Sequence, residues 1–332
     1  MFFIFVSEVP SVFMKRITFQ SQRVVPAQAS RHVFLFMLWL ISAVVIVMLI
    51  LAAPARAAQP AETSPFALEI PFDSDHGVPI VKVWVNGKGP FAFIVDTGEE
   101  HMGVISPKIA NELKLPQVGT GKTSDPTNGH EVDGPMFETA TLEFAGFKSE
   151  KVQLFGIDAG VDGVIGLPMF REYLSEFQPA NKRIVLRRAS LPESNGKDIF
   201  TYTAPEGIPD MEMSIAGRPV RVHPDSGNPG TISLPKKLGA GLDWVAPPVK
   251  VGEAGTIANK FDIFEGQVKT DLRLGQFVFP HPYIVVNDFS GTHANFGFGL
   301  FKLFRSVSFD QQHLRVRFES DKNTIQIESL FQ

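Results

Sequence analysis

The sequence predicts a mainly β fold made of two similar units, preceded by a hydrophobic N-terminal helix. Three observations support this prediction. Gly, Pro and Phe are abundant, at 28, 25 and 30 of 332 residues, as in β proteins with many turns. A strand-like run at 91–98 ends in Asp-Thr-Gly, and Pro-Asp-Ser-Gly appears later at 224–227. The segments around these two motifs also follow the same order along the chain.

The composition excludes several kinds of chemistry. The net charge of −4 gives no reason to expect a nucleic-acid partner. The chain contains no cysteine, so disulfides, thiolate nucleophiles and cysteine metal ligands are impossible. Its eight histidines include no His-Glu-x-x-His zinc motif, and no Gly-x-Ser-x-Gly motif of a serine hydrolase occurs.

Residues 1–58 are expected to form an export signal peptide or a membrane anchor. The run at 33–53 is apolar throughout, basic residues precede it, and small-x-small sequences follow it. It is long enough to span a bilayer, so a cleaved signal and a retained anchor both remain open. In either case the rest of the chain would be exported to the periplasmic or extracellular side. A retained segment would anchor it in the inner membrane.

The first predicted unit covers residues 66–188. We expect strands at 78–85 and 91–95 joined by a hairpin turn, then a short helix over 106–115. A second helix is predicted over 169–177.

A polar segment at 119–134 lies between strand-like stretches of this unit. Its composition favours a hairpin with Asn128 and Gly129 at its tip, which could act as a flap over a cleft. An ordinary surface loop is the alternative.

The second predicted unit covers residues 208–320, after a linker at 189–207. Asp225 lies 129 positions after Asp96, and Leu300 lies 133 positions after Leu167. Six landmarks recur in one order at nearly constant offsets. We interpret this pattern as an internal duplication.

At these residues the chain resembles the aspartic peptidases, specifically the retropepsin-like bacterial type. The resemblance rests on VDTG at 95–98, GVIGL at 163–167, PDSG at 224–227 and GFGL at 297–300. It covers about residues 78–318. It implies a small closed β-barrel in each unit, with the two barrels related by a pseudo-twofold axis.

The resemblance also implies a site at the junction of the two units. Asp96 and Asp225 would form a catalytic dyad. The neighbouring turn residues would support it by hydrogen bonds across the junction and by close approach of the two loops. These supporting residues are Thr97, Gly98, Ser226 and Gly227.

Two carboxyl groups in contact cannot both ionise, so they share a proton. The ionised group can take a proton from water while the protonated group donates to a peptide carbonyl. The expected substrate is a peptide or protein, and this chemistry requires neither a metal nor a cofactor.

Two departures from the family pattern leave alternatives open. Pro224 predicts that the second strand ends or bends before Asp225. Glu99 follows the first motif, where it would either raise the pKa of the pair or point to solvent. Although a monomeric pseudodimer is favoured, the protein could instead be an inactive, exported binding protein, or a peptidase whose first unit pairs between two chains.

Overall fold

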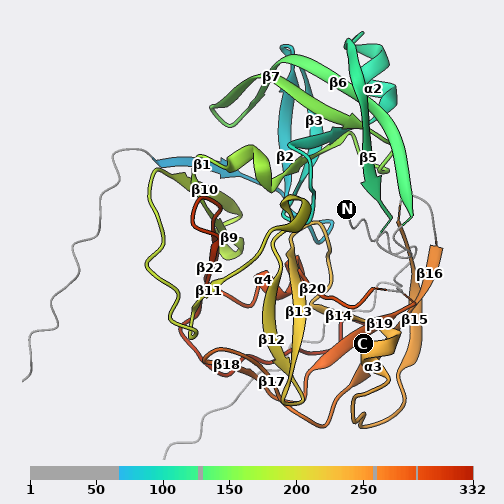
Figure 1. Cartoon of the computed structure of the whole chain (residues 1–332), viewed down its shortest axis with the longest axis vertical. Coiled ribbons are helices and arrows are strands. Elements are labelled where there is room, and N and C mark those ends of the chain that lie inside the picture. Colours follow the sequence, from blue (N-terminus) through green and yellow to red (C-terminus); the bar gives the residue numbers. More distant parts are fainter. Residues whose placement is uncertain (1–66, 126–129, 257–259, 289–290, 332) are drawn as a thin grey trace, which may run out of the picture. The chain divides into compact units, whose positions relative to one another are not determined.

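The computed structural model describes residues 67–125, 130–256, 260–288 and 291–331 (Figure 1). The predicted signal or anchor at 1–58 and the predicted hairpin tip at Asn128 and Gly129 lie outside the described residues. No helix within the described part of the chain is both long and apolar enough to cross a membrane.

The fold is mainly β, as predicted, and the first sheet closes into a barrel. Its strand order is β2-β3-β8-β4-β7-β6-β5, and β6 pairs with β2 as well, which closes a ring of six strands. The strands are β2 (Ile80–Val85), β3 (Lys88–Asp96), β4 (Gly103–Ile105), β5 (Gln117–Ser124), β6 (Glu131–Phe144), β7 (Phe147–Gly156) and β8 (Gly163–Gly166).

Local sequence explains the start of this barrel. Residues of β2 alternate between buried and exposed, as expected for a strand with one face on a core. Asn86 and Gly87 connect β2 to β3 with φ values of 51° and 73°. Positive φ at both central residues is typical of a tight two-residue hairpin, as the sequence predicted.

The second sheet has nine strands in the order β15-β16-β19-β14-β20-β13-β12-β17-β18. They are β12 (Met211–Ile215), β13 (Arg218–Asp225), β14 (Ile232–Pro235), β15 (Val249–Gly255), β16 (Lys260–Gln267), β17 (Leu272–Leu274), β18 (Phe277–Phe279), β19 (Tyr283–Asn287) and β20 (Ala294–Gly297).

Several pairings of the first sheet recur in the second. Strand β3 runs parallel to β8 with Asp96 opposite Gly166, and β13 runs parallel to β20 with Asp225 opposite Gly297. Strands β8 and β20 then pair antiparallel with β4 and β14. Gly297 therefore occupies the position of Gly166, and the predicted match of Leu300 with Leu167 is two residues out of register.

The helices are short. The predicted first helix is present as α2 (Pro107–Glu112), and α3 (Lys236–Gly239) and α4 (Phe298–Phe301) follow later in the chain. The predicted helix over 169–177 is wrong. A 3₁₀ turn, η1 (Leu167–Phe170), leads instead into strand β9 (Leu174–Gln178), whose alternate residues are buried. The buried side chains of this segment recur at every second residue, as in a strand, and not at the spacing of a helix.

A third sheet joins strands from both ends of the described chain, in the order β1-β10-β9-β21-β22-β11. Its central pair, β9 and β21, is antiparallel. Besides β9, the strands of this sheet are β1 (Ala67–Pro71), β10 (Arg183–Arg187), β11 (Ile199–Thr201), β21 (Ser306–Asp310) and β22 (Arg315–Glu319). Two 3₁₀ turns, η2 (Pro179–Asn181) and η3 (Pro205–Gly207), lie next to these strands along the chain.

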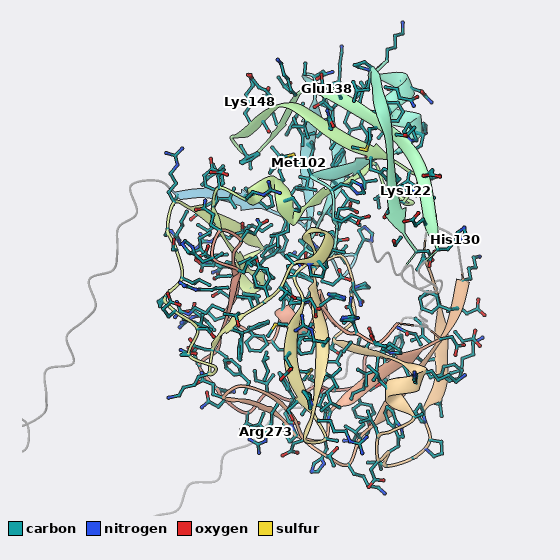
Figure 2. All side chains as sticks on the ribbon, in the orientation of Figure 1. Met102, Lys122, His130, Glu138, Lys148 and Arg273 are labelled. Carbon is teal, nitrogen blue, oxygen red and sulfur yellow. The ribbon has the colours of Figure 1, made fainter. Side chains whose placement is uncertain are left out.

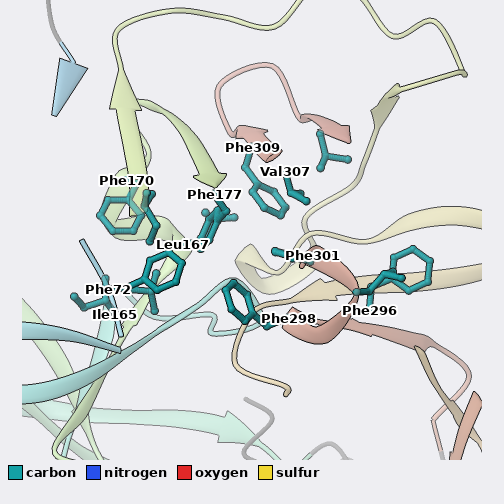
Figure 3. Packing of buried hydrophobic residues seen from close by; sticks show 14 of the residues in the cluster. Phe72, Ile165, Leu167, Phe170, Phe177, Phe296, Phe298, Phe301, Val307 and Phe309 are labelled. Carbon is teal, nitrogen blue, oxygen red and sulfur yellow. The ribbon is translucent and has the colours of Figure 1, made fainter. Parts of the chain in front are cut away.

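Aromatic side chains from distant segments share one hydrophobic core beside this sheet (Figure 3). Phe177 on β9 packs edge-to-face against Phe301 on α4 and Phe309 on β21, with ring centroids 5.9 Å apart in each pair. Phe72 contacts Phe298 in the same manner at 5.7 Å. Segments before residue 188 and after residue 208 therefore depend on each other for burial of their apolar surface.

Candidate active site

The two motif aspartates end corresponding strands. Asp96 is the last residue of β3 and Asp225 is the last residue of β13, and both side chains are fully buried. The turns that follow these strands contact each other directly.

Two hydroxyl groups bind the turns together. Thr97 donates its hydroxyl to the carbonyl oxygen of Pro224 at 2.7 Å, and its Oγ1 accepts the backbone N–H of Ser226 at 2.9 Å. Ser226 makes the reciprocal pair: its hydroxyl donates to Val95 O at 2.7 Å, and its Oγ accepts the N–H of Thr97 at 3.0 Å. Four hydrogen bonds thus fix the position of one aspartate relative to the other.

Both turns leave little space for a side chain at their glycine. A Cβ on Gly227 would lie 2.4 Å from Asp96 Cγ, and a Cβ on Gly98 would lie 3.0 Å from Asp225 Cγ. Neither glycine has a positive φ. Close approach of the opposite carboxyl group, and not an unusual backbone angle, is the reason for glycine here.

The two carboxyl groups have different hydrogen-bond partners. Asp225 Oδ1 accepts the backbone N–H groups of Gly227 at 2.9 Å and Asn228 at 3.1 Å, and its Oδ2 accepts the side-chain amide of Asn295 at 2.6 Å. Asp96 Oδ1 accepts the N–H of Gly98 at 2.7 Å and that of Gly227 at 3.3 Å. Within the described residues, no group donates to the buried Asp96 Oδ2.

The surroundings raise the pKa of both carboxyl groups. Burial raises the pKa of Asp96 well above its ordinary value, and the charge of Asp225 raises it further. Burial also raises the pKa of Asp225, although the hydrogen bond from Asn295 opposes this increase. The charge of one carboxyl group therefore opposes ionisation of the other.

Sequence reasoning missed Asn228 and Asn295 and left Glu99 undecided. Glu99 does not point to solvent, because its side chain is fully buried. Its Oε1 accepts the backbone N–H of His101 at 2.9 Å and contacts His101 Nδ1 at 2.7 Å. The His101 ring in turn stacks on Phe155 at 4.9 Å.

A sequence signal for Asn228 existed: it directly follows the second motif, as Glu99 follows the first. Asn295 gave no comparable signal, since its neighbour Asp225 lies 70 positions away in the chain.

The second strand does not end at Pro224, as one of the two predicted outcomes required. Strand β13 continues through Asp225, with Pro224 opposite Phe296 of β20. At the matching position of the first sheet, Val95 donates its N–H to Pro79 O and not to β8. Proline at 224 therefore removes no hydrogen bond from the ladder with β20.

The ends of two hairpins approach each other (Figure 1). Strands β5 and β6 form the hairpin predicted for 119–134, and β15 and β16 form the other. The Thr256 hydroxyl of the second hairpin donates to Asp125 Oδ2 of the first at 2.6 Å. Lys122 and His130 mark the end of the first hairpin in Figure 2.

In the described part of the chain, no three His, Asp or Glu side chains gather where they could hold a metal ion. The site instead contains two buried carboxyl groups whose Oδ1 atoms both accept the backbone N–H of Gly227.

Residues 81–169 match the family model described as aspartyl protease. The match supports a retropepsin-like aspartyl protease family for this part of the chain. The matched residues include the first motif with Asp96, Thr97 and Gly98, whereas Asp225 lies outside them. The aspartyl protease domain indicates a peptidase in general terms. No curated protein sequence matches the chain.

Proposed function

We propose that this protein is an exported, single-chain aspartic endopeptidase that hydrolyses peptide bonds with the Asp96 and Asp225 carboxyl groups. The observation that carries the proposal is the close approach of these two buried groups, which both accept the backbone N–H of Gly227. Reciprocal hydrogen bonds from Thr97 and Ser226 hold their turns together. Two acids buried side by side without a positively charged partner would lower the stability of the fold, so a purely structural role does not explain them.

The chemistry follows from one shared proton. A water molecule that contacts both carboxyl groups would give a proton to the ionised group and attack the peptide carbonyl carbon. The protonated group would donate to the carbonyl oxygen, so that a neutral tetrahedral intermediate forms. Proton transfer to the leaving nitrogen then breaks the C–N bond, and no covalent enzyme intermediate arises.

The third sheet supports the proposal of two related units at 66–188 and 208–320. Exchange of β1, β10 and β9 with β11, β22 and β21 leaves its strand order unchanged, although β11 lies in the predicted linker at 189–207 and not in the second unit. The central register has the same symmetry, since Phe177 pairs with Val307 and Ser175 pairs with Phe309. Such a register is expected for a pseudo-twofold axis that passes between β9 and β21, and hence for a duplicated unit.

The two hairpins support a peptide as the substrate. An extended peptide can pair with strand edges through its backbone, and a covered site excludes water from the reaction. The Asp125–Thr256 hydrogen bond would hold the hairpins together above such a peptide.

Export is proposed from the sequence at 1–58, in which an apolar run follows a basic segment. The same segment would contact the membrane if it is not removed.

The test is cleavage of a peptide library by the full-length protein between pH 3 and 7, with and without a statine-type inhibitor. Asp96→Asn and Asp225→Asn should each lower kcat by about 10²–10⁴-fold, because each removes one partner of the proton transfer. A loss only in Asp96→Asn would support pairing of the first unit between two chains. No cleavage by the wild type at any pH would favour the inactive binding protein and refute the proposed activity.

A further inference from the structure

The two carboxyl groups occupy matching positions but do not have matching neighbours. The Asp225 carboxyl group accepts a hydrogen bond from the side-chain amide of Asn295. Asn295 lies two residues before Gly297 on β20. The residue two positions before Gly166 on β8 is Val164. Because valine has no polar hydrogen, Asp96 has no donor from the corresponding position.

The orientation of the Asn295 amide is fixed by a chain of hydrogen bonds. Gly230 donates its backbone N–H to Asn228 Oδ1 at 2.8 Å, so the Asn228 NH₂ group must point the other way. That NH₂ group donates to Asn295 Oδ1 at 2.6 Å, which turns the Asn295 NH₂ group toward Asp225. A backbone N–H can only donate, so the direction of every later bond in the chain is determined.

The first half of the molecule has an equivalent first hydrogen bond but lacks the later bonds of this series. His101 donates its backbone N–H to Glu99 Oε1 at 2.9 Å, just as Gly230 donates to Asn228. The Glu99 carboxylate accepts hydrogen bonds, whereas the Asn228 amide can also donate one. Val164 occupies the position in the first half that corresponds to Asn295 in the second. Glu99 places a buried carboxyl group near Asp96, and its charge opposes a second charge there.

Both differences favour the same distribution of charge. We propose that Asn295 is a positioning residue which holds Asp225 as the ionised member of the pair and so leaves the shared proton on Asp96. Asn228 fixes the orientation of the Asn295 amide. The charge of Glu99 likewise favours the proton on Asp96. Under the proposed function, Asp225 is then the base that takes the proton from water and Asp96 is the acid that donates to the peptide carbonyl.

Other titratable groups surround the pair. Glu99 and His101 lie in the turn after β3, His223 lies on β13, and His293 precedes β20 with its ring stacked on His223 at 4.7 Å. A substitution at Asn295 alters none of these charges, so its effect on the pair can be measured separately.

The experiment compares wild type with Asn295→Val, which copies Val164, in the full-length protein. Loss of a donor to the ionised carboxylate raises the pKa of Asp225. The acidic limb of the kcat/KM profile should therefore move to higher pH by about one unit. A ¹³C NMR titration of the carboxyl signals should show the same shift for Asp225.

Two further variants make the result interpretable. Val164→Ala is the matched control, because it alters the equivalent buried position and should lower stability without moving the acidic limb. Should Asn295→Val fail to fold, Asn228→Ala keeps the Asn295 amide but releases its orientation, and a smaller shift in the same direction is expected.

An unchanged titration of Asp225 in both asparagine variants, or an equal shift in Val164→Ala, would overturn the inference. This inference rests on the proposed function only for the roles of acid and base. If the wild type cleaves no peptide, the carboxyl titration still decides which aspartate is ionised, so failure of the activity and failure of the charge assignment remain distinct.

Discussion

At the scale of single residues, the site is defined by groups that are buried and also able to ionise. Asp96, Asp225 and Glu99 are all fully buried, and only hydrogen bonds or proton uptake can stabilise such groups. Asp225 accepts three donors, whereas the Oδ2 atom of Asp96 accepts none from the described protein groups. The stability of the fold should therefore depend on pH through Asp96 and Asp225.

The first prediction concerns Asp96. Its pKa in the folded state is raised above the ordinary value of 3.8, so its favourable contribution is complete below that pH. The contribution is lost as the pH rises through the folded-state pKa. Asp96→Asn, which cannot ionise, should consequently melt about 2–4 °C above wild type at pH 7. At pH 3.5 the two proteins should melt together in a calorimetric scan, and an equal difference at both pH values would contradict the prediction.

The second prediction concerns His101. Hydrogen bonding and attraction from Glu99 outweigh the opposing effect of burial and raise the pKa of His101 above its ordinary value of 6.5. The stabilising contribution is complete below pH 6.5 and declines as the pH rises through the folded-state pKa. His101→Phe keeps a ring to stack on Phe155 but removes a donor from Glu99. It should lower the free energy of unfolding by about 1–3 kcal/mol at pH 6.

Chemical denaturation at pH 6 and pH 8.5 measures this effect. The difference between wild type and His101→Phe should be smaller at pH 8.5. A variant as stable as wild type at pH 6 would show that Glu99 does not depend on His101.

At the scale of elements, short turns and hairpins position the chemistry while the sheets supply rigidity. The ends of β3 and β13 carry the aspartates, and parallel pairing with β8 and β20 fixes each end. The hairpins β5–β6 and β15–β16 meet through the Asp125–Thr256 hydrogen bond, which connects residues 131 positions apart. Under the proposed function, this bond would help to hold the hairpins over a bound peptide.

The third prediction is that Thr256→Val weakens peptide binding. Valine keeps the shape of threonine but cannot donate to Asp125, so the hairpins should separate more easily. KM for a peptide substrate should rise by about 3–10-fold, with kcat changed less than twofold. Lys122→Ala is the control in the first hairpin, because it removes only the exposed ion pair with Glu131 and should leave both constants unchanged. An equal effect of the two variants would show that the contact with Thr256 is unimportant.

At the scale of the whole molecule, the two halves are not independent. They share the central pairing of β9 with β21 and one hydrophobic core that includes Phe177, Phe301 and Phe309. The described residues accordingly belong to one compact unit. A half expressed alone would expose an unpaired strand edge and a large apolar surface.

The fourth prediction is that residues 66–188 and 189–332 do not fold separately but associate when expressed together. Dispersed amide NMR signals should appear only for the pair, and peptide cleavage should return with it. Substitution of Phe177 by Asp, which places a charge in the shared core, should abolish the association. A folded, monomeric fragment 66–188 would contradict this prediction.

The sequence alone determined the class of fold, the two motif turns and the pairing of Asp96 with Asp225 as a hypothesis. The fold class and the turns could be predicted because strands and tight turns depend on residues close together in the chain, whereas the pairing of Asp96 with Asp225 came from the resemblance to the aspartic peptidases. It failed where short-range patterns compete, as at 169–177, where buried alternation produced strand β9 in place of a helix. Only the tertiary structure decided that Glu99 is buried, that Pro224 remains within its strand, and that Asn295 reaches Asp225. These outcomes depend on the register between strands 70 or more residues apart, which no local pattern specifies.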